Sequence, residues 1–226
     1  MKRFYKDVAV ADRGAILLDG KPVRTPARAE LILPTAALAE AVAAEWRAQD
    51  GEIDPRSMRL TGLSNAAIDR IAPDLAAFAR PLAAYAESDL LCYRADAPAE
   101  LVARQAEAWN PLLDWAGRRF DVHFTVTSGI VHASQPEATI ARLGQALAAY
   151  DAFHLAALAP IVTIGGSLVT ALALAEEEID PDSAFDLTHL DELWQALRWG
   201  EDKLALEARA VRRRDFMAAA QLLDLL

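Results

Sequence analysis

The longest uncharged stretch of the chain runs from His154 to Ala175, HLAALAPIVTIGGSLVTALALA, and contains no Asp, Glu, Lys or Arg. A helix that is apolar on every side must be enclosed by protein or by lipid, whereas a surface helix shows a single apolar stripe. Pro160, the Gly165-Gly166 pair and the lack of basic residues at either end argue against a membrane span. We therefore predict a buried central helix over 154–178 within a helical domain, and keep a membrane span as the alternative.

The first 33 residues carry the only sustained β-type pattern near the start of the chain. Asp19-Gly20, between AILL and KPVRT, predicts a two-residue hairpin turn, because both residues accept a positive φ. A second strand pair is predicted between Tyr5–Ala11 and Leu31–Leu33. Such a small sheet needs a packing partner to be stable.

The period becomes helical at Thr35, which is predicted to cap a helix that ends at Gly51. Pro73 is predicted to separate two further helical pieces, and Pro81 to end or kink the second one. The alternation of VHFTVT at 122–127 predicts a half-buried strand.

From residue 134 onward the pattern predicts helices and no strand. Ser134 to Glu137 has the spacing of a capping box. Another helix is predicted to face inward with Leu190, Leu193, Trp194 and Leu197. The predicted fold class is α+β, mostly α, with a small N-terminal β domain containing one helix (1–60) and a larger helical domain (61–226).

Charge and cysteine content narrow the classes of partner and compartment. The 33 acidic and 23 basic residues give a net charge of −10, which disfavours nucleic acid and anionic membrane surfaces as partners. The lone Cys92 excludes an intramolecular disulfide and fits a buried thiol in a reducing compartment. The start, MKRFYKDVAV, lacks the pattern of a secretory or organelle leader, so we expect a cytoplasmic bacterial protein or else an already processed form.

The chain shows no pattern that is typical of catalysis. The four histidines (123, 132, 154 and 189) lack metal-ligand spacing, and no serine stands in a nucleophile motif, so we expect no metal, no cofactor and no enzymatic activity. One alternative stays open, in which Gly165-Gly166 forms a phosphate-binding turn of a small-molecule enzyme. A second alternative is a helical protein that binds some other partner.

Several blocks of the chain resemble, in order, the ATP-twelve family of assembly chaperones for the F-one sector of ATP synthase. They are RFYKDVAV, LDGKPVRTPA, LPTAALAEAVAAEW, LTGLSNAAIDR, DLLCYRA, WNPLLDWA, GSLVTALAL and LDELWQALRWGED. The resemblance runs from about Arg3 to the C-terminus and implies a small β domain joined to a larger helical domain, in agreement with the periodicity.

The resemblance implies an ATP-independent chaperone that binds the unassembled α subunit, shields its subunit interface and releases it on assembly with the β subunit. It implies a bacterial member in the cytoplasm, with eukaryotic relatives in the mitochondrial matrix, and we expect a monomer without stable membrane association. Acidic positions in the C-terminal helical domain are implied in partner binding. The candidate partner-binding residues are Asp191, Glu192, Glu201 and Asp202, together with the aromatic residues Trp199 and Trp46.

Overall fold

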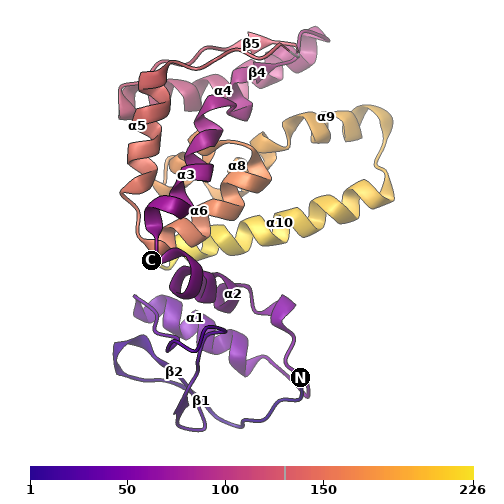
Figure 1. The fold of residues 1–226 in the computed structure, drawn as a ribbon. Coiled ribbons are helices and arrows are strands. Elements are labelled where there is room, and N and C mark those ends of the chain that lie inside the picture. The colour runs from indigo at the N-terminus through magenta and orange to yellow at the C-terminus, as the bar shows by residue number, and fades with distance from the viewer. Residues whose placement is uncertain (130) are drawn as a thin grey trace. The chain divides into compact units, whose positions relative to one another are not determined.

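The computed structural model describes residues 1–129 and 131–226, which divide into two compact units (Figure 1). The first unit contains Met1–Leu75, Asp151–Ala157 and Ala218–Leu226, and the second contains Ala76–Tyr150 and Leu158–Met217. The predicted fold class is confirmed: a small N-terminal β-sheet precedes a larger, mostly helical region. The domain boundary predicted at residue 60 stays a prediction.

The strands and helices follow one another in this order. In these labels η denotes a short 3₁₀ or π helix. The first part of the chain contains β1 (Val8–Val10), η1 (Asp12–Gly14), β2 (Ile16–Leu18), β3 (Lys21–Pro22), α1 (Ala36–Arg47), η2 (Pro55–Ser57), α2 (Arg59–Ala66) and η3 (Ala67–Ile71). They are followed by α3 (Leu75–Ala83), η4 (Ala84–Glu87), η5 (Leu90–Cys92), β4 (Tyr93–Arg94), α4 (Ala99–Phe120), β5 (Thr127–Ser128), α5 (Glu137–Ala148), α6 (Ala152–Gly165), α7 (Leu168–Ala175), α8 (Pro181–Thr188), α9 (Leu190–Trp199) and α10 (Lys203–Asp224).

The first unit contains an antiparallel sheet in the order β1-β2-β3. The predicted turn joins β2 to β3: Leu18 pairs with Lys21, and Asp19 and Gly20 both have positive φ, at 47° and 77°. The predicted pairing of Tyr5–Ala11 with Leu31–Leu33 is wrong. Strand β1 pairs with β2 instead, and Leu31–Leu33 lies beside residues 14–16, because the turn returns the chain along β2 first.

Helix α1 begins as predicted, with the Thr35 side chain accepting a hydrogen bond from the Leu38 N–H. It ends at Arg47, before the predicted end at Gly51, whose positive φ of 66° serves the following turn. The core beside the sheet is formed by Tyr5, Leu18, Ile53 and Met58, with Val8, Val23 and Trp46 packed against it.

The second unit is built around α7, in which every residue from Leu168 to Leu174 is buried. Helices α4 and α8 pack against it. The prediction of one continuous central helix over 154–178 is wrong, because the uncharged stretch forms two helices, α6 and α7. Gly166 takes a positive φ of 68° between them, and the Ser167 hydroxyl caps α7 by accepting a hydrogen bond from the Thr170 N–H.

The predicted capping box at Ser134 is also absent, because Pro136 takes the N-cap position of α5 without a side-chain cap. Pro73 separates η3 from α3 as predicted. Within the described residues, no helix is both long enough and apolar enough to cross a membrane.

Shortening a side chain in α7 should therefore leave a cavity. We expect Leu168→Ala, at a fully buried position, to lower the free energy of unfolding by about 2–4 kcal/mol. The same substitution at Leu204, which is 75% exposed, should change it by less than about 0.5 kcal/mol. Chemical denaturation followed by circular dichroism measures both; equal losses would mean that α7 is not the core of its unit.

Candidate functional site: the α9–α10 hairpin

Helix α9 and the part of α10 before Met217 form a hairpin, and its connecting turn at 200–202 lies away from the other helices of the second unit (Figure 1). Gly200 makes the turn with a positive φ of 87°. Asp202 then caps α10, since its carboxylate accepts a hydrogen bond from the Ala205 N–H at 3.0 Å. All the predicted C-terminal site residues lie on this hairpin.

Large apolar side chains are exposed near the turn. Leu197, Trp199 and Leu204 are each about three-quarters exposed, at 75%, 74% and 75%, and Leu206 is 42% exposed. The prediction that Leu197 faces inward is therefore wrong: Trp194 fills the inner face, at 5% exposure, while Leu197 lies three residues further, where the hairpin has left the body of the unit. We call Leu197, Trp199, Leu204, Leu206, Glu201 and Asp202 the tip surface.

Trp199 is held in place despite its exposure. Its ring meets that of the buried Trp194 edge to face, with ring centroids 5.6 Å apart. Beside it lies a hollow of about 220 Å³ that is lined by residues of both helices, including Glu201, Asp202 and Arg209. An exposed aromatic ring with a fixed neighbour loses little conformational freedom when a partner covers it.

An ion-pair cluster joins the two helices below the tip surface. Arg209, 9% exposed, contacts Glu201 at 2.6 Å and Glu192 at 3.5 Å, and Arg212 also contacts Glu192. Burial lowers the pKa of His189 below its ordinary value, which fits its acceptance of a long hydrogen bond, 3.4 Å, from the Arg212 guanidinium. Glu192 and Glu201 thus hold the hairpin together, and a charge on either one is partly offset within the chain.

The Asp191 side chain is hydrogen-bonded to helix α4. Its carboxylate accepts a hydrogen bond of 2.7 Å from the buried Gln105 amide, whose oxygen in turn accepts one from the Ala95 N–H. Among the predicted acidic residues, Asp202 therefore has the carboxylate that is least occupied by other side chains, since within residues 1–129 and 131–226 it accepts one hydrogen bond, from the Ala205 N–H, and forms no ion pair.

Trp46 has a packing role in the first unit. Its ring lies edge to face with Tyr5 at 5.7 Å, and the Tyr5 hydroxyl donates a 2.6 Å hydrogen bond to the Trp46 carbonyl oxygen. Its indole N–H is buried without an acceptor in the described part of the chain. A partner-binding role for Trp46 stays a prediction.

The exposed leucines of the tip surface were missed by the sequence analysis, although the sequence carries a signal for them. Leu204 and Leu206 are two residues apart, which on a helix places them about 200° apart, so both cannot face the same core. Their exposure follows from the projection of the hairpin beyond the unit, which no local pattern encodes.

The predicted alternative of a phosphate site at Gly165-Gly166 does not fit the geometry. The N–H groups at the start of α7 already have acceptors: Asp89 takes that of Val169 at 2.9 Å, and Ser167 takes that of Thr170 at 3.0 Å. A phosphate would have to displace the Asp89 carboxylate, which carries a charge of the same sign. Gly165 instead allows close packing, because a Cβ there would lie 3.1 Å from the Thr188 methyl group.

No three of the His, Cys, Asp and Glu side chains in the described part of the chain lie together as ligands for a metal ion. Cys92 is buried, and burial raises the pKa of its thiol to about 12. A thiol with such a pKa is a poor nucleophile at neutral pH.

Comparison with known proteins shows which class of protein has this fold. A family model described as ATP12 chaperone protein matches residues 2–117. Crystal structures of Atp12 from Paracoccus denitrificans and of its D202K mutant are both 40% identical to the chain, with 99% of this chain and 97% of each relative covered and TM-scores of 0.93 and 0.94. Mitochondrial protein atp12 of Schizosaccharomyces pombe is 25% identical over 214 residues, which are 88% of this chain and 74% of that protein.

The class is thus that of the assembly chaperones, with a small β unit and a larger helical unit. The chain belongs to the ATP12 chaperone family. Its general role, as the resemblance implied, is in ATP synthase assembly.

The buried carboxylate of Asp89 generates a pH prediction. Burial raises the pKa of Asp89 to about 6, against hydrogen bonds from the Val169 and Leu91 N–H groups that lower it. Because the folded state binds this proton more tightly than the unfolded state, the stabilisation is present near pH 4 and is lost as the pH rises through 6. The loss should approach about 3 kcal/mol.

Asp89→Asn removes this titration. As the pH rises from 4 to 7, we expect the free energy of unfolding of the wild type to fall relative to that of Asp89→Asn, as measured by urea denaturation at each pH. A difference that stays constant over this range would show that Asp89 remains charged throughout.

Proposed function

We propose that the chain binds the unassembled α subunit of the ATP synthase F-one sector, shields the surface that later meets the β subunit, and releases it on assembly. Membership of the ATP12 chaperone family supports the general role. The observation that supports the binding site is the tip surface, where exposed apolar side chains stand beside the carboxylates of Asp202, which caps α10, and Glu201, which pairs with Arg209. The chain acts as a monomer in the cytoplasm and without nucleotide.

The tip surface has the composition of an interface centre. A tryptophan that a partner covers fully, surrounded by apolar contacts that exclude water, carries much of the energy of protein association, and a charged rim excludes wrong partners and guides encounter. Trp199 and the leucines supply the first feature, and Asp202 and Glu201 the second. Its partner surface should therefore be apolar and carry arginine or lysine at its edge.

The four candidate acids have different roles in this proposal. Asp202 contacts the partner directly, and Glu201 adds charge while it holds Arg209. Glu192 and Asp191 keep the hairpin in position through Arg209, Arg212 and Gln105. Trp46, in the first unit, is left as a packing residue.

The role of Asp202 can be separated from its role as a helix cap. Asparagine also caps helices well, so Asp202→Asn should keep the stability of α10 while it removes the charge. We expect it to weaken capture of the purified α subunit by about 5-fold to 30-fold at low salt, and by less at high salt, as measured by titration calorimetry.

The matched control is Asp180→Asn, since Asp180 caps α8 in the same unit through the Ser183 N–H. This variant should bind like the wild type. Equal binding by all three proteins would place the contact away from Asp202.

The apolar part is tested at Trp199. We expect Trp199→Ala to weaken α-subunit capture at least about 10-fold, as an interface centre does when a tryptophan is truncated, and to leave the melting temperature nearly unchanged. Phe4→Ala, at another exposed aromatic residue, is the control and should have no effect on capture. If the α subunit binds none of these proteins, including the wild type, the chain serves another partner.

A further inference from the structure

An extended segment, residues 122–127, lies beside α4 in the second unit, and part of one of its edges, at Phe124 and Val126, has no hydrogen-bond partner within the described residues. It follows the end of α4, where Asp121 takes a left-handed conformation with φ 53°. Only Thr127 belongs to a regular strand, β5, which pairs in parallel with β4. The sequence pattern predicted a half-buried strand here, and the chain is extended although most of it has no strand partner.

The odd-numbered residues of the segment are bonded to the rest of the unit. The Thr139 hydroxyl accepts from the His123 N–H at 3.3 Å and donates to the His123 carbonyl oxygen at 2.7 Å. The buried Gln135 amide does the same for Thr125, at 2.9 and 2.8 Å. One side chain just before α5, Gln135, and one in its first turn, Thr139, thus take the place of a neighbouring strand.

The even-numbered residues point to the other edge, because the backbone groups of an extended chain alternate in direction. Within the described residues, the N–H and C=O groups of Phe124 and Val126 have no hydrogen-bond partner. Val126 is 48% exposed. We call the backbone groups of Phe124 and Val126 the open edge.

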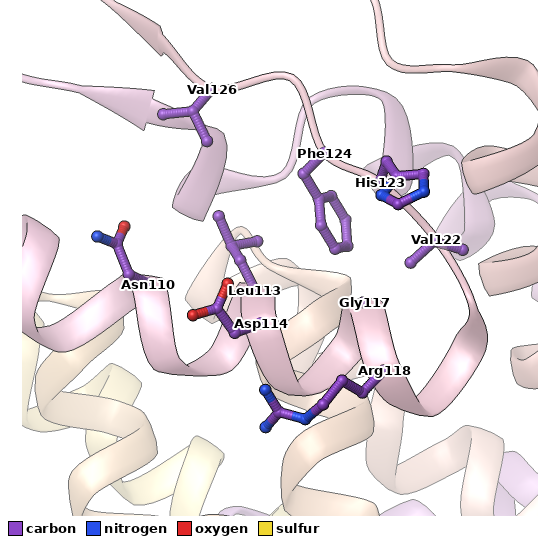
Figure 2. A pocket seen from close by; sticks show the side chains of 9 residues that line it. All are labelled: Asn110, Leu113, Asp114, Gly117, Arg118, Val122, His123, Phe124 and Val126. Carbon is purple, nitrogen blue, oxygen red and sulfur yellow. The ribbon is translucent and has the colours of Figure 1, made fainter.

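A groove of about 570 Å³ adjoins the open edge. Figure 2 shows the side chains of Val122, Phe124 and Val126 facing α4 across it, with Leu113 on the opposite wall. The rim on α4 carries two charged side chains one helical turn apart, Asp114 and Arg118. Neither forms an ion pair with any part of the chain that the structure describes.

We propose that the open edge accepts an extended segment of the bound protein as an added β-strand. Unpaired N–H and C=O groups along an exposed edge are a template for such pairing, and a groove that receives every second side chain supplies specificity. Helix and strand spacings are close here: four residues along a helix rise about 6.0 Å, and alternate strand residues are about 6.6 Å apart.

The charges and the apolar floor define the occupant. Val126 lies toward the Asn110 end of the groove and Val122 beside Gly117 (Figure 2). In antiparallel pairing, the inward residues of the occupant are an aliphatic residue near Val126, a base near Asp114 and an acid near Arg118, at alternate positions in that order. The choice of the α subunit as its source rests on the proposed function; the shape and charge of the site do not.

The test uses the full chain with two probes, the purified α subunit and a blocked synthetic peptide, Thr-Val-Thr-Lys-Thr-Glu-Thr. Hydrogen exchange is followed by NMR at single amides. We expect the Phe124 and Val126 amides to exchange at least about 10-fold more slowly with a bound strand, and the Thr125 amide, which is already bonded, to change little.

The peptide with its lysine and glutamate exchanged has the same composition and should bind at least about 3-fold more weakly. Val126→Pro removes one donor of the open edge and should abolish the protection of Phe124, whereas Val126→Ala keeps the donor and should retain it. The wild-type exchange rates decide the question even if Val126→Pro fails to fold.

Protection of the two amides by either probe supports the inference. If both probes leave them unprotected at saturating concentration, the inference is overturned. Failure of the α subunit to form any complex would overturn the proposed function instead, and the peptide would still decide whether the open edge accepts a strand.

Discussion

In the second unit, a single buried carboxylate joins the start of α7 to η5. Asp89 has no exposed surface, and it accepts hydrogen bonds from the Val169 N–H of α7 and the Leu91 N–H of η5. It thereby fixes the start of the most apolar helix to the segment that leads into β4. Burying a carboxylate without a cation is costly, and its retention here is explained by the backbone donors that would otherwise be left without acceptors. The same contacts occupy the position that a phosphate would need, so the interaction that holds the start of α7 also argues against a phosphate-binding turn at Gly165-Gly166.

The sequence predicts the parts of the fold that local chemistry decides. The Asp19-Gly20 turn, the Thr35 cap and the break at Pro73 are encoded within a few residues, and all three are confirmed. The errors arise where contacts between residues far apart in the sequence determine the local structure. Leu31–Leu33 pairs beside residues 14–16 because of the path of the whole sheet, and the uncharged stretch is interrupted because Ser167 and Asp89 complete a helix start at its middle. In the candidate site, the acids could be found by their position in the sequence, but their partners could not. Glu192 and Glu201 meet Arg209 only after the chain reverses at Gly200.

The hairpin and the open edge are the two means of binding that we propose, and they differ in kind although they lie within one unit. The hairpin presents side chains, held in place by the Arg209 cluster and the contact between Trp194 and Trp199, so little order has to be gained on binding. The open edge presents backbone groups, which recognise an extended conformation more than a composition. A protein that receives an unassembled subunit benefits from both, because such a subunit exposes apolar surface and unpaired strands before its partners arrive.

The clamp formed by Gln135 and Thr139 has a consequence for how related sequences can diverge. Because it holds His123 and Thr125 by their backbones, the exposed side chains of these two residues are open to substitution, whereas Phe124 and Val126 line the groove against α4. The length of the segment is not open in the same way. Inserting or deleting one residue between Asp121 and Thr127 would exchange odd and even positions, turning the unpaired groups inward against α5 and leaving the two clamping side chains without partners. Among descendants of this sequence, residue type should therefore drift at positions 123 and 125, while gaps are excluded from the whole segment.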